Sequence, residues 1–202
     1  MKNFDPEEAY PLLFENFRRI FPIPLVLVRD FTQRSVMIEF KKSDMITDGV
    51  QLSEYSYFII RGLIMCYTPN DGTNVVRWIR SEDDYAYSMD MFRIKFGYDP
   101  RLIGNILVAM EDTVVIGIKH EDIFWLQDNS IEMGIIVNTL MTFHTGLDQQ
   151  MPRIHSLAPV ERYKEIQQRV SYDLSRVPDI YLASFLNITL RELKEVRESI
   201  QQ

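Results

Sequence analysis

Hydrophobic and polar positions change their spacing three times along the 202-residue chain. Near the start, Leu13, Phe17 and Ile20 belong to an apolar stripe at helical spacing. Pro6 and the two glutamates that follow it suit the first turn of a helix. We therefore expect a short helix here, and the prolines of "PIP" at residues 22–24 should end it.

From about residue 26 to residue 118 the pattern is that of short strands. Runs rich in Val, Ile, Phe and Tyr alternate with turn residues, as in "SVMIEF", "NVVRWIR", "NILVAM" and "TVVIGIK". "TPNDGT" separates two such runs, and its Asp-Gly pair is typical of a hairpin. Many short strands without long helices between them predict an antiparallel barrel or jelly roll. A parallel α/β sheet would need intervening helices.

Apolar residues then return at 3-4 spacing from about residue 121 onwards. This spacing is that of a heptad seam, which favours a long helix that pairs with a second copy of itself. A helix that packs on its own β-domain is the alternative, since further apolar residues widen the surface, and both arrangements can hold at once. The residues assigned to the dimer seam are Met133, Ile136, Leu140 and Phe143.

Three short helices are expected at the C-terminal end. "DQQMPRIHSLAP" reads as a hinge, and "SLAPVERYKEIQQRV" predicts a helix with Ser156 as its candidate N-cap and Pro159 in its first turn. "PDIYLASFLN" and "TLRELKEVRESI" then predict two helices joined by a tight turn. Asn187 suits the left-handed turn position, and Thr189 suits the N-cap of the second helix.

Charge argues against a simple nucleic-acid binder. The chain has 22 Lys+Arg and 29 Asp+Glu, a formal net charge of -7. Residues 151–202 carry eight basic and seven acidic side chains, a net +1, so residues 1–150 carry -8. An ordinary DNA-binding domain has a clear positive footprint, and the C-terminal part does not have one.

Candidate chemistry for an enzyme or a metal site is scarce in the sequence. Cys66 is the only cysteine, which excludes intrachain disulfides and cysteine-ligated clusters. His120, His144 and His155 are far apart and outside the expected strands, so no metal ion, no cofactor and no enzymatic activity are expected. The acidic N-terminus lacks a signal core and no apolar run spans a bilayer, so we expect a soluble cytoplasmic protein without membrane contact.

Three segments together resemble the Crp/Fnr family of bacterial transcription regulators. They are "YFIIRGLIMCYTPNDGTNVVRWI", "LVAMEDTVVIGIKHEDIFWL" and "LAPVERYKEI" followed by "RVPDIYLASFLNITLRELKEVRES". The resemblance implies an α+β fold with a jelly-roll-like antiparallel β-roll, a cyclic-nucleotide-binding-like sensor domain, over residues 1–125. It further implies a dimerisation helix over 126–150 and a helix-turn-helix domain without a wing over 151–202.

The family's nucleotide-pocket motif is absent from this chain. Cyclic-nucleotide binders of the family have a Gly-Glu pair and an arginine for the cyclic phosphate, and Ile103 stands at the arginine position here. Asp90 and Arg101 are the remaining candidates for an effector pocket, with ordinary loop charges as the alternative. The resemblance therefore implies an unknown small effector, and tight binding of cyclic AMP is not expected.

The predicted recognition helix also departs from the family. Leu190 and Glu195 stand where the family has its two base-reading arginines. An i,i+4 ion pair between Arg191 and Glu195 on a solvated helix face is the alternative to DNA contact. Two functions therefore stay open: a homodimeric DNA-binding regulator, or a dimeric ligand- or protein-interaction module without DNA binding. The residues assigned to DNA are Thr189, Arg191, Lys194 and Arg197.

Overall fold

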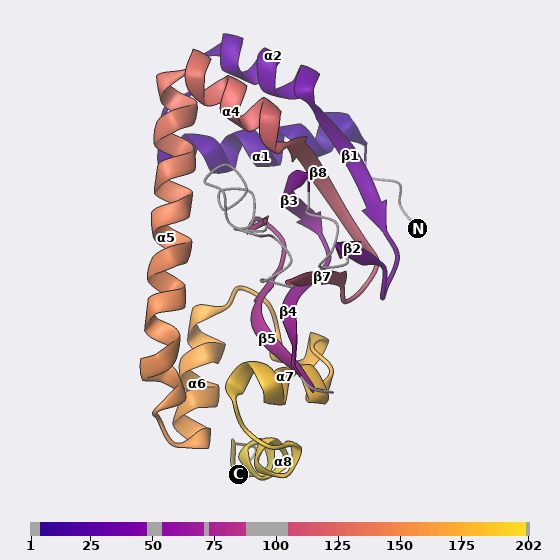
Figure 1. The fold of residues 1–202 in the computed structure, drawn as a ribbon, viewed down its shortest axis with the longest axis vertical. Helices are drawn as coiled ribbons and strands as arrows, with labels where there is room; N and C mark the ends of the chain where they lie inside the picture. The colour runs from indigo at the N-terminus through magenta and orange to yellow at the C-terminus, as the bar shows by residue number, and fades with distance from the viewer. Residues whose placement is uncertain (1–4, 48–53, 71–72, 88–104, 201–202) are drawn as a thin grey trace.

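The computed structural model describes residues 5–47, 54–70, 73–87 and 105–200. In this part of the chain a long helix runs beside two β-sheets, with helices at both ends (Figure 1). The helices are α1 (Pro6–Ile20), α2 (Leu25–Arg34), α4 (His120–Asn129), α5 (Ile131–His155), α6 (Pro159–Arg169), the 3-10 helix η2 (Leu174–Arg176), α7 (Asp179–Leu186) and α8 (Leu190–Ile200). The strands are β1 (Ser35–Phe40), β2 (Met45–Thr47), β3 (Tyr55–Arg61), β4 (Ile64–Asn70), β5 (Thr73–Arg80), β6 (Tyr85–Ala86), β7 (Ile106–Ala109) and β8 (Thr113–Lys119).

The strands form two four-stranded antiparallel sheets. Sheet A has the order β1-β8-β3-β6, and sheet B has the order β2-β7-β4-β5. The chain changes sheet several times, and two of these corners lie at Gly62, between β3 and β4, and between β7 and β8. A hydrogen bond of 2.7 Å from the amide of Met110 to the carbonyl of Leu63 joins these two corners. The predicted antiparallel β-structure and the β4–β5 strand pair are confirmed.

The N-terminal helix α1 begins at Pro6, as predicted, and Asp5 caps it by accepting a hydrogen bond from the amide of Glu7. The expectation of strands from residue 26 is wrong, because α2 covers Leu25–Arg34. Leu27 and Phe31, four residues apart, are the buried pair of this helix. The helix turns these two side chains into the core and leaves Val26 51% exposed, so tertiary packing decides the segment.

The predicted long helix is interrupted at Ser130. The backbone of Ser130 is extended (φ -145°, ψ 119°), and its hydroxyl accepts a hydrogen bond of 3.2 Å from the amide of Met133 to cap α5. The expected hinge at residues 148–159 is wrong for the most part, since α5 continues to His155. Ser156 is not the N-cap of α6: its hydroxyl donates to the carbonyl of Arg153, and Ala158 occupies the cap position.

Three apolar clusters hold the described residues together. One lies under α1, α2, α4 and α5 against sheet A, and one fills the interior of the roll between the two sheets. The third, here called the joint cluster, connects sheet B to the C-terminal helices. Its buried members from the roll are Leu63, Met65, Val76, Ile79 and Met110. Its buried members from the C-terminal part are Ile154, Ile166, Tyr172, Leu174, Val177, Leu182, Ala183, Phe185, Leu186 and Leu193.

Polar contacts of Arg176 and Ser184 also connect the roll to the C-terminal helices. The guanidinium of Arg176 donates to both oxygens of Glu82, at 2.8 and 3.0 Å, and to Glu111. The hydroxyl of Ser184 in α7 accepts from the amide of Val76 (3.1 Å) and donates to the carbonyl of Asn74 (2.8 Å). Both backbone groups belong to β5, the edge strand of sheet B, so α7 covers an edge that would otherwise be open.

The corner at Gly62 yields a stability prediction. Gly62 has φ +108°, and a Cβ there would lie 2.7 Å from the Cα of Thr113. Gly62→Ala is therefore expected to lower the free energy of unfolding by about 2 kcal/mol or more. Gly134 in α5 is the matched control, since a Cβ there meets nothing within 4 Å. Gly134→Ala should raise the free energy of unfolding by about 1 kcal/mol. Urea unfolding of the two variants measures both values, and equal effects would contradict the corner geometry.

Candidate functional site

The turn between α7 and α8 has the geometry that its sequence predicts. Asn187 ends α7 in the left-handed conformation, with φ 52° and ψ 49°. The hydroxyl of Thr189 accepts a hydrogen bond from the amide of Glu192 at 3.2 Å. The carboxylate of Glu192 in turn accepts from the amide of Thr189 at 2.7 Å, which completes a reciprocal capping box. These bonds lower the pKa of Glu192, so this acidic residue serves to start the helix.

Arg162 of α6 holds this turn in place through hydrogen bonds to its carbonyl groups. Its buried guanidinium donates to the carbonyls of Leu186 (2.8 Å) and Asn187 (2.7 Å), and to that of Leu157 (2.8 Å). The last carbonyls of a helix have no partner within the helix, so a buried cation at this point satisfies them. The position of α8 relative to α7 therefore depends on α6.

Three of the four residues assigned to DNA already have acidic partners. The hydroxyl of Thr189 donates to Glu192. Arg191, whose side chain is 90% exposed, pairs with Glu195 at 2.9 Å. Arg197 pairs with Asp179 of α7 at 2.6 Å. Lys194 is exposed and forms no ion pair within the described residues.

A hollow of about 750 Å³ lies at the mouth of the roll, between sheet B and α5. Tyr87 and Asn105, which flank the segment that carries Asp90 and Arg101, both line this hollow. Asp90 and Arg101 themselves lie outside the described residues.

A buried polar network connects the roll to α5 beside this hollow. The imidazole of His144 is hydrogen-bonded through Nε2 to Asp84 (3.1 Å) and through Nδ1 to the hydroxyl of Tyr87 (2.7 Å). A carboxylate only accepts, so Nε2 carries the proton and Nδ1 accepts from Tyr87. Arg80 also donates to both oxygens of Asp84, at 3.3 Å each.

The pKa values of this network keep one negative and one positive charge in it. Burial lowers the pKa of His144, so the ring stays neutral at pH 7. Burial alone would raise the pKa of Asp84, but the hydrogen bond from His144 and the charge of Arg80 outweigh it and lower that pKa. Burial raises the pKa of Tyr87 to about 12, so Tyr87 holds its proton.

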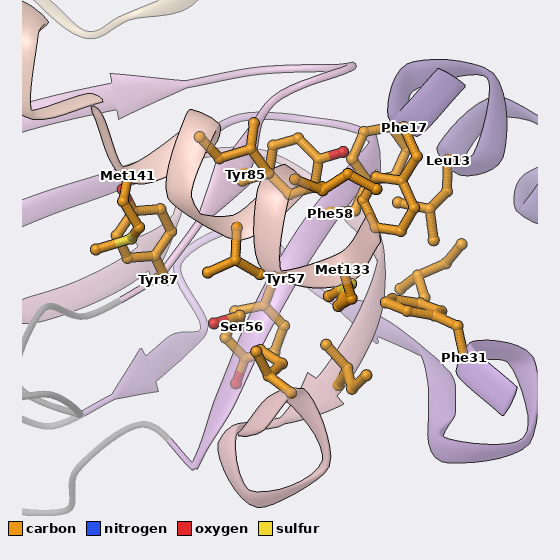
Figure 2. A pocket seen from close by; sticks show the side chains of 16 residues that line it. Leu13, Phe17, Phe31, Ser56, Tyr57, Phe58, Tyr85, Tyr87, Met133 and Met141 are labelled. Atoms are coloured by element: carbon orange, nitrogen blue, oxygen red, sulfur yellow. The ribbon is translucent and has the colours of Figure 1, made fainter. Parts of the chain in front are cut away.

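A second, apolar cavity of about 70 Å³ lies between α1, sheet A and α5. Figure 2 shows aromatic side chains around it, with Phe17, Phe58 and Tyr85 on one side and Met133 of α5 facing in. It is smaller than the roughly 150 Å³ cavity that binds benzene in an engineered protein core. A nucleotide therefore does not fit there.

The dimer seam needs a correction, because two of its four residues belong to the core of the same chain. Met133 is 3% exposed and Ile136 0% exposed, and Leu140 is partly buried against the same cluster. Phe143 alone is exposed, at 59%. Apolar 3-4 spacing marks a buried face, but it does not identify the surface that buries it. For Met133 and Ile136 the alternative, packing on the β-domain, is confirmed.

The opposite face of α5 is turned to solvent: Ile131 is 81% exposed, and a Cβ at Gly134 or Gly146 would meet nothing within 4 Å. It has no charged side chain from Met133 to Leu147. The residues that share this outward face at helical spacing are Ile131, Gly134, Asn138, Thr142 and Gly146. No role was expected for His144, although it stands eleven residues after Met133 and therefore on the buried face.

Neither a metal centre nor a membrane span is found in the described part of the chain. No group of three or more His, Cys, Asp or Glu side chains is placed to hold a metal ion there. No helix among these residues is long and apolar enough to cross a membrane.

The arrangement of sheets and helices is shared with solved structures of transcription regulators. No family model matches the chain, and no curated protein matches it by sequence. FixK2 from Bradyrhizobium japonicum superposes with a TM-score of 0.69 at 14% identity, over 83% of this chain and 84% of that chain. A putative Crp/Fnr regulator from Eubacterium rectale gives 0.67 at 12% identity, over 91% and 88%. The c-di-GMP-responsive global regulator CLP from Xanthomonas campestris gives 0.64 at 15% identity, over 88% and 92%. The chain has the Crp/Fnr fold.

Two buried histidines predict how stability depends on pH. Burial lowers the pKa of His120 from 6.5 to about 4, and that of His144 also lies below 6.5. As the pH falls below about 6.5 the unfolded chain binds protons that the folded chain does not, so the free energy of unfolding decreases. Each such proton contributes about 1.4 kcal/mol per pH unit. His120→Phe should flatten the decrease between pH 6.5 and 4 in urea titrations; curves parallel to the wild type would contradict the burial of a neutral ring.

Proposed function

We propose that this chain is a DNA-binding transcription regulator of the Crp/Fnr type that acts as a homodimer and responds to a small ligand in the roll. One observation carries most weight: the likeness to solved regulators extends over 83 to 91% of the chain, well beyond the β-roll. The exposure of Thr189 just before α8, and of Arg191 and Lys194 on it, supports DNA as the partner, with Arg197 partly exposed beside them. DNA binds this surface once two ion pairs have broken, that of Arg191 with Glu195 and that of Arg197 with Asp179.

The effector site that we propose is the hollow at the mouth of the roll. Asp90 and Arg101 lie in the segment between Tyr87 and Asn105, and both of these flanking residues line it. His144 of α5 also lines this hollow and is bonded to Asp84 of the roll, so a ligand here acts on the contact between roll and helix. Such a ligand shifts DNA affinity only if it binds the two arrangements unequally.

The ion pair of Arg191 with Glu195 leads to a DNA-binding prediction. Glu195→Gln frees the guanidinium of Arg191, so affinity for promoter DNA at low salt should rise severalfold, and the salt dependence should steepen by about one phosphate contact. Glu15→Gln is the matched control, because Glu15 forms the same i,i+4 pair with Arg19 on α1, far from α8. Gel retardation of sheared genomic DNA and of the protein's own promoter at two salt concentrations measures both variants. Equal behaviour of the two variants would remove Arg191 from the DNA surface.

A second candidate function is favoured by the same ion pairs. If the carboxylates of Glu195 and Asp179 hold their arginines permanently, α8 presents an electrically balanced face that DNA does not attract. The chain would then be a dimeric ligand- or protein-interaction module. No retention of any genomic fragment at low salt, for wild type and for Glu195→Gln alike, would exclude the first function and leave this one.

The dimer that we propose uses the uncharged outward face of α5. A Cβ at Gly146 meets nothing within 4 Å in one chain, so Gly146→Glu adds a charge to this face without disturbing the fold. We expect the solution mass to fall to 23.9 kDa, that of one chain, because a carboxylate is costly to bury in an apolar interface. Leu25→Glu, at an 83% exposed position of α2, is the control and should leave the mass unchanged. Light scattering gives the masses, and a Gly146→Glu dimer would exclude this face.

A further inference from the structure

The apolar cavity between α1, sheet A and α5 has no part in the function proposed above. Its volume is about 70 Å³, and among the described residues it shares only Tyr87 with the effector hollow at the mouth of the roll. Native cores rarely keep a void larger than one water molecule, which needs only about 10–15 Å³. This cavity is several times larger, which makes it a candidate binding site.

A single small residue on sheet A explains why this space is open. Side chains alternate between the two faces of a strand, so Ser56, Phe58 and Ile60 of β3 share one face. Phe58 and Ile60 pack there against the helices, as does Ile118 of β8, the register partner of Ser56. Ser56 has the smallest side chain in the lining and leaves the room that a large apolar residue would take (Figure 2).

The walls of the cavity are almost wholly carbon. The hydroxyl of Tyr85 donates to Asn16 at 2.8 Å, and that of Tyr87 donates to His144 at 2.7 Å, and neither partner lines the cavity. A buried water needs two to four polar partners, which these walls do not offer. The cavity therefore stays dry and favours an uncharged apolar molecule.

A ligand in the cavity contacts the roll and α5 at once. Ile136 is fully buried, so the accessible surface belongs to less buried lining residues, among them Ser56 of β3 and Val137, Leu140 and Met141 of α5. Because these side chains come from both parts, a bound molecule stabilises the packing of α5 on sheet A by mass action.

The volume limits the ligand to a few atoms. It is roughly half that of the ~150 Å³ cavity that binds benzene, so about three or four heavy atoms fit. We propose that this cavity binds a small uncharged hydrocarbon of about three or four carbon atoms, between Ser56 of sheet A and Met133 and Met141 of α5. A ligand of this size binds with a Kd on the order of 1 mM at best. The site goes beyond the proposed effector hollow and does not depend on DNA binding.

The test uses cyclopropane as the probe and the purified full chain without DNA, with ¹³C label in the methionine methyl groups. Met133 and Met141 line the cavity, whereas Met65 and Met110 are buried in the joint cluster and serve as internal controls. With increasing cyclopropane pressure the NMR signals of Met133 and Met141 should shift saturably, and those of Met65 and Met110 should not. Acetamide, which is of similar size but polar, should shift none of the four.

A variant that fills the cavity tests the position of the ligand. Ser56→Leu places an apolar side chain in the same space, so it should weaken cyclopropane binding at least about tenfold and raise the urea midpoint of unfolding. Ser175→Leu makes the same change at an exposed position of η2 and is the matched control. It should bind cyclopropane as the wild type does.

Three results would each overturn the proposal. They are no saturable shift of Met133 and Met141 in the wild type, equal shifts with acetamide, and unchanged cyclopropane affinity in Ser56→Leu. The first means that the cavity is a packing void that admits no ligand. The second means that the site does not select apolar molecules, and the third that cyclopropane binds elsewhere. Circular dichroism of Ser56→Leu confirms that the variant is folded, and the wild-type titrations test the proposal without it.

Discussion

The joint cluster between sheet B and the C-terminal helices is the contact on which the rest of the structure depends. Leu182 and Leu186 of α7 are fully buried, and they lie in one cluster with Leu63 and Met65 of the roll. At about 25 cal/mol for each Å² of apolar surface buried, such side chains each contribute roughly 1.5–3 kcal/mol. Arg176 adds charged hydrogen bonds to Glu82 and Glu111 across the same contact. The C-terminal helices are therefore held by the roll itself, and a hinge in the connecting segment does not decide their position.

The two faces of α5 have separate tasks. Its inner face carries Met133 and Ile136 into the apolar core and His144 into the polar network with Asp84. Its outer face is uncharged over four turns and open to solvent. The inner face is thus fixed to the roll, and the outer face is open to a second copy in the dimer that we propose. Two acidic residues of α8 likewise have different structural roles. Glu192 caps the start of the helix, and Glu195 neutralises Arg191.

The sequence predicted those features of the fold that depend on interactions between neighbouring residues. Pro6 gave the start of α1, and Asn187 and Thr189 gave the turn before α8, because caps and left-handed positions depend on a few neighbouring residues. Spacing alone could not predict which surface buries Met133, since the same stripe suits a sheet and a second helix. The network of Arg80, Asp84 and His144 was out of reach for a different reason: its members lie up to 64 residues apart in the sequence, and only tertiary packing brings them together.

Native-state hydrogen exchange tests most directly whether the joint cluster makes the roll and the C-terminal helices one folding unit. The amide of Val76 in β5 is bonded to Ser184 of α7, so exchange at Val76 and at Leu186 reports both sides of the joint. If the roll and the C-terminal helices form one unit, both amides open with the same free energy, and Arg176→Met lowers both values by the same amount. If α7 opens at a much smaller free energy than β5 and Arg176→Met changes neither, the C-terminal helices are an independent domain and the account is wrong.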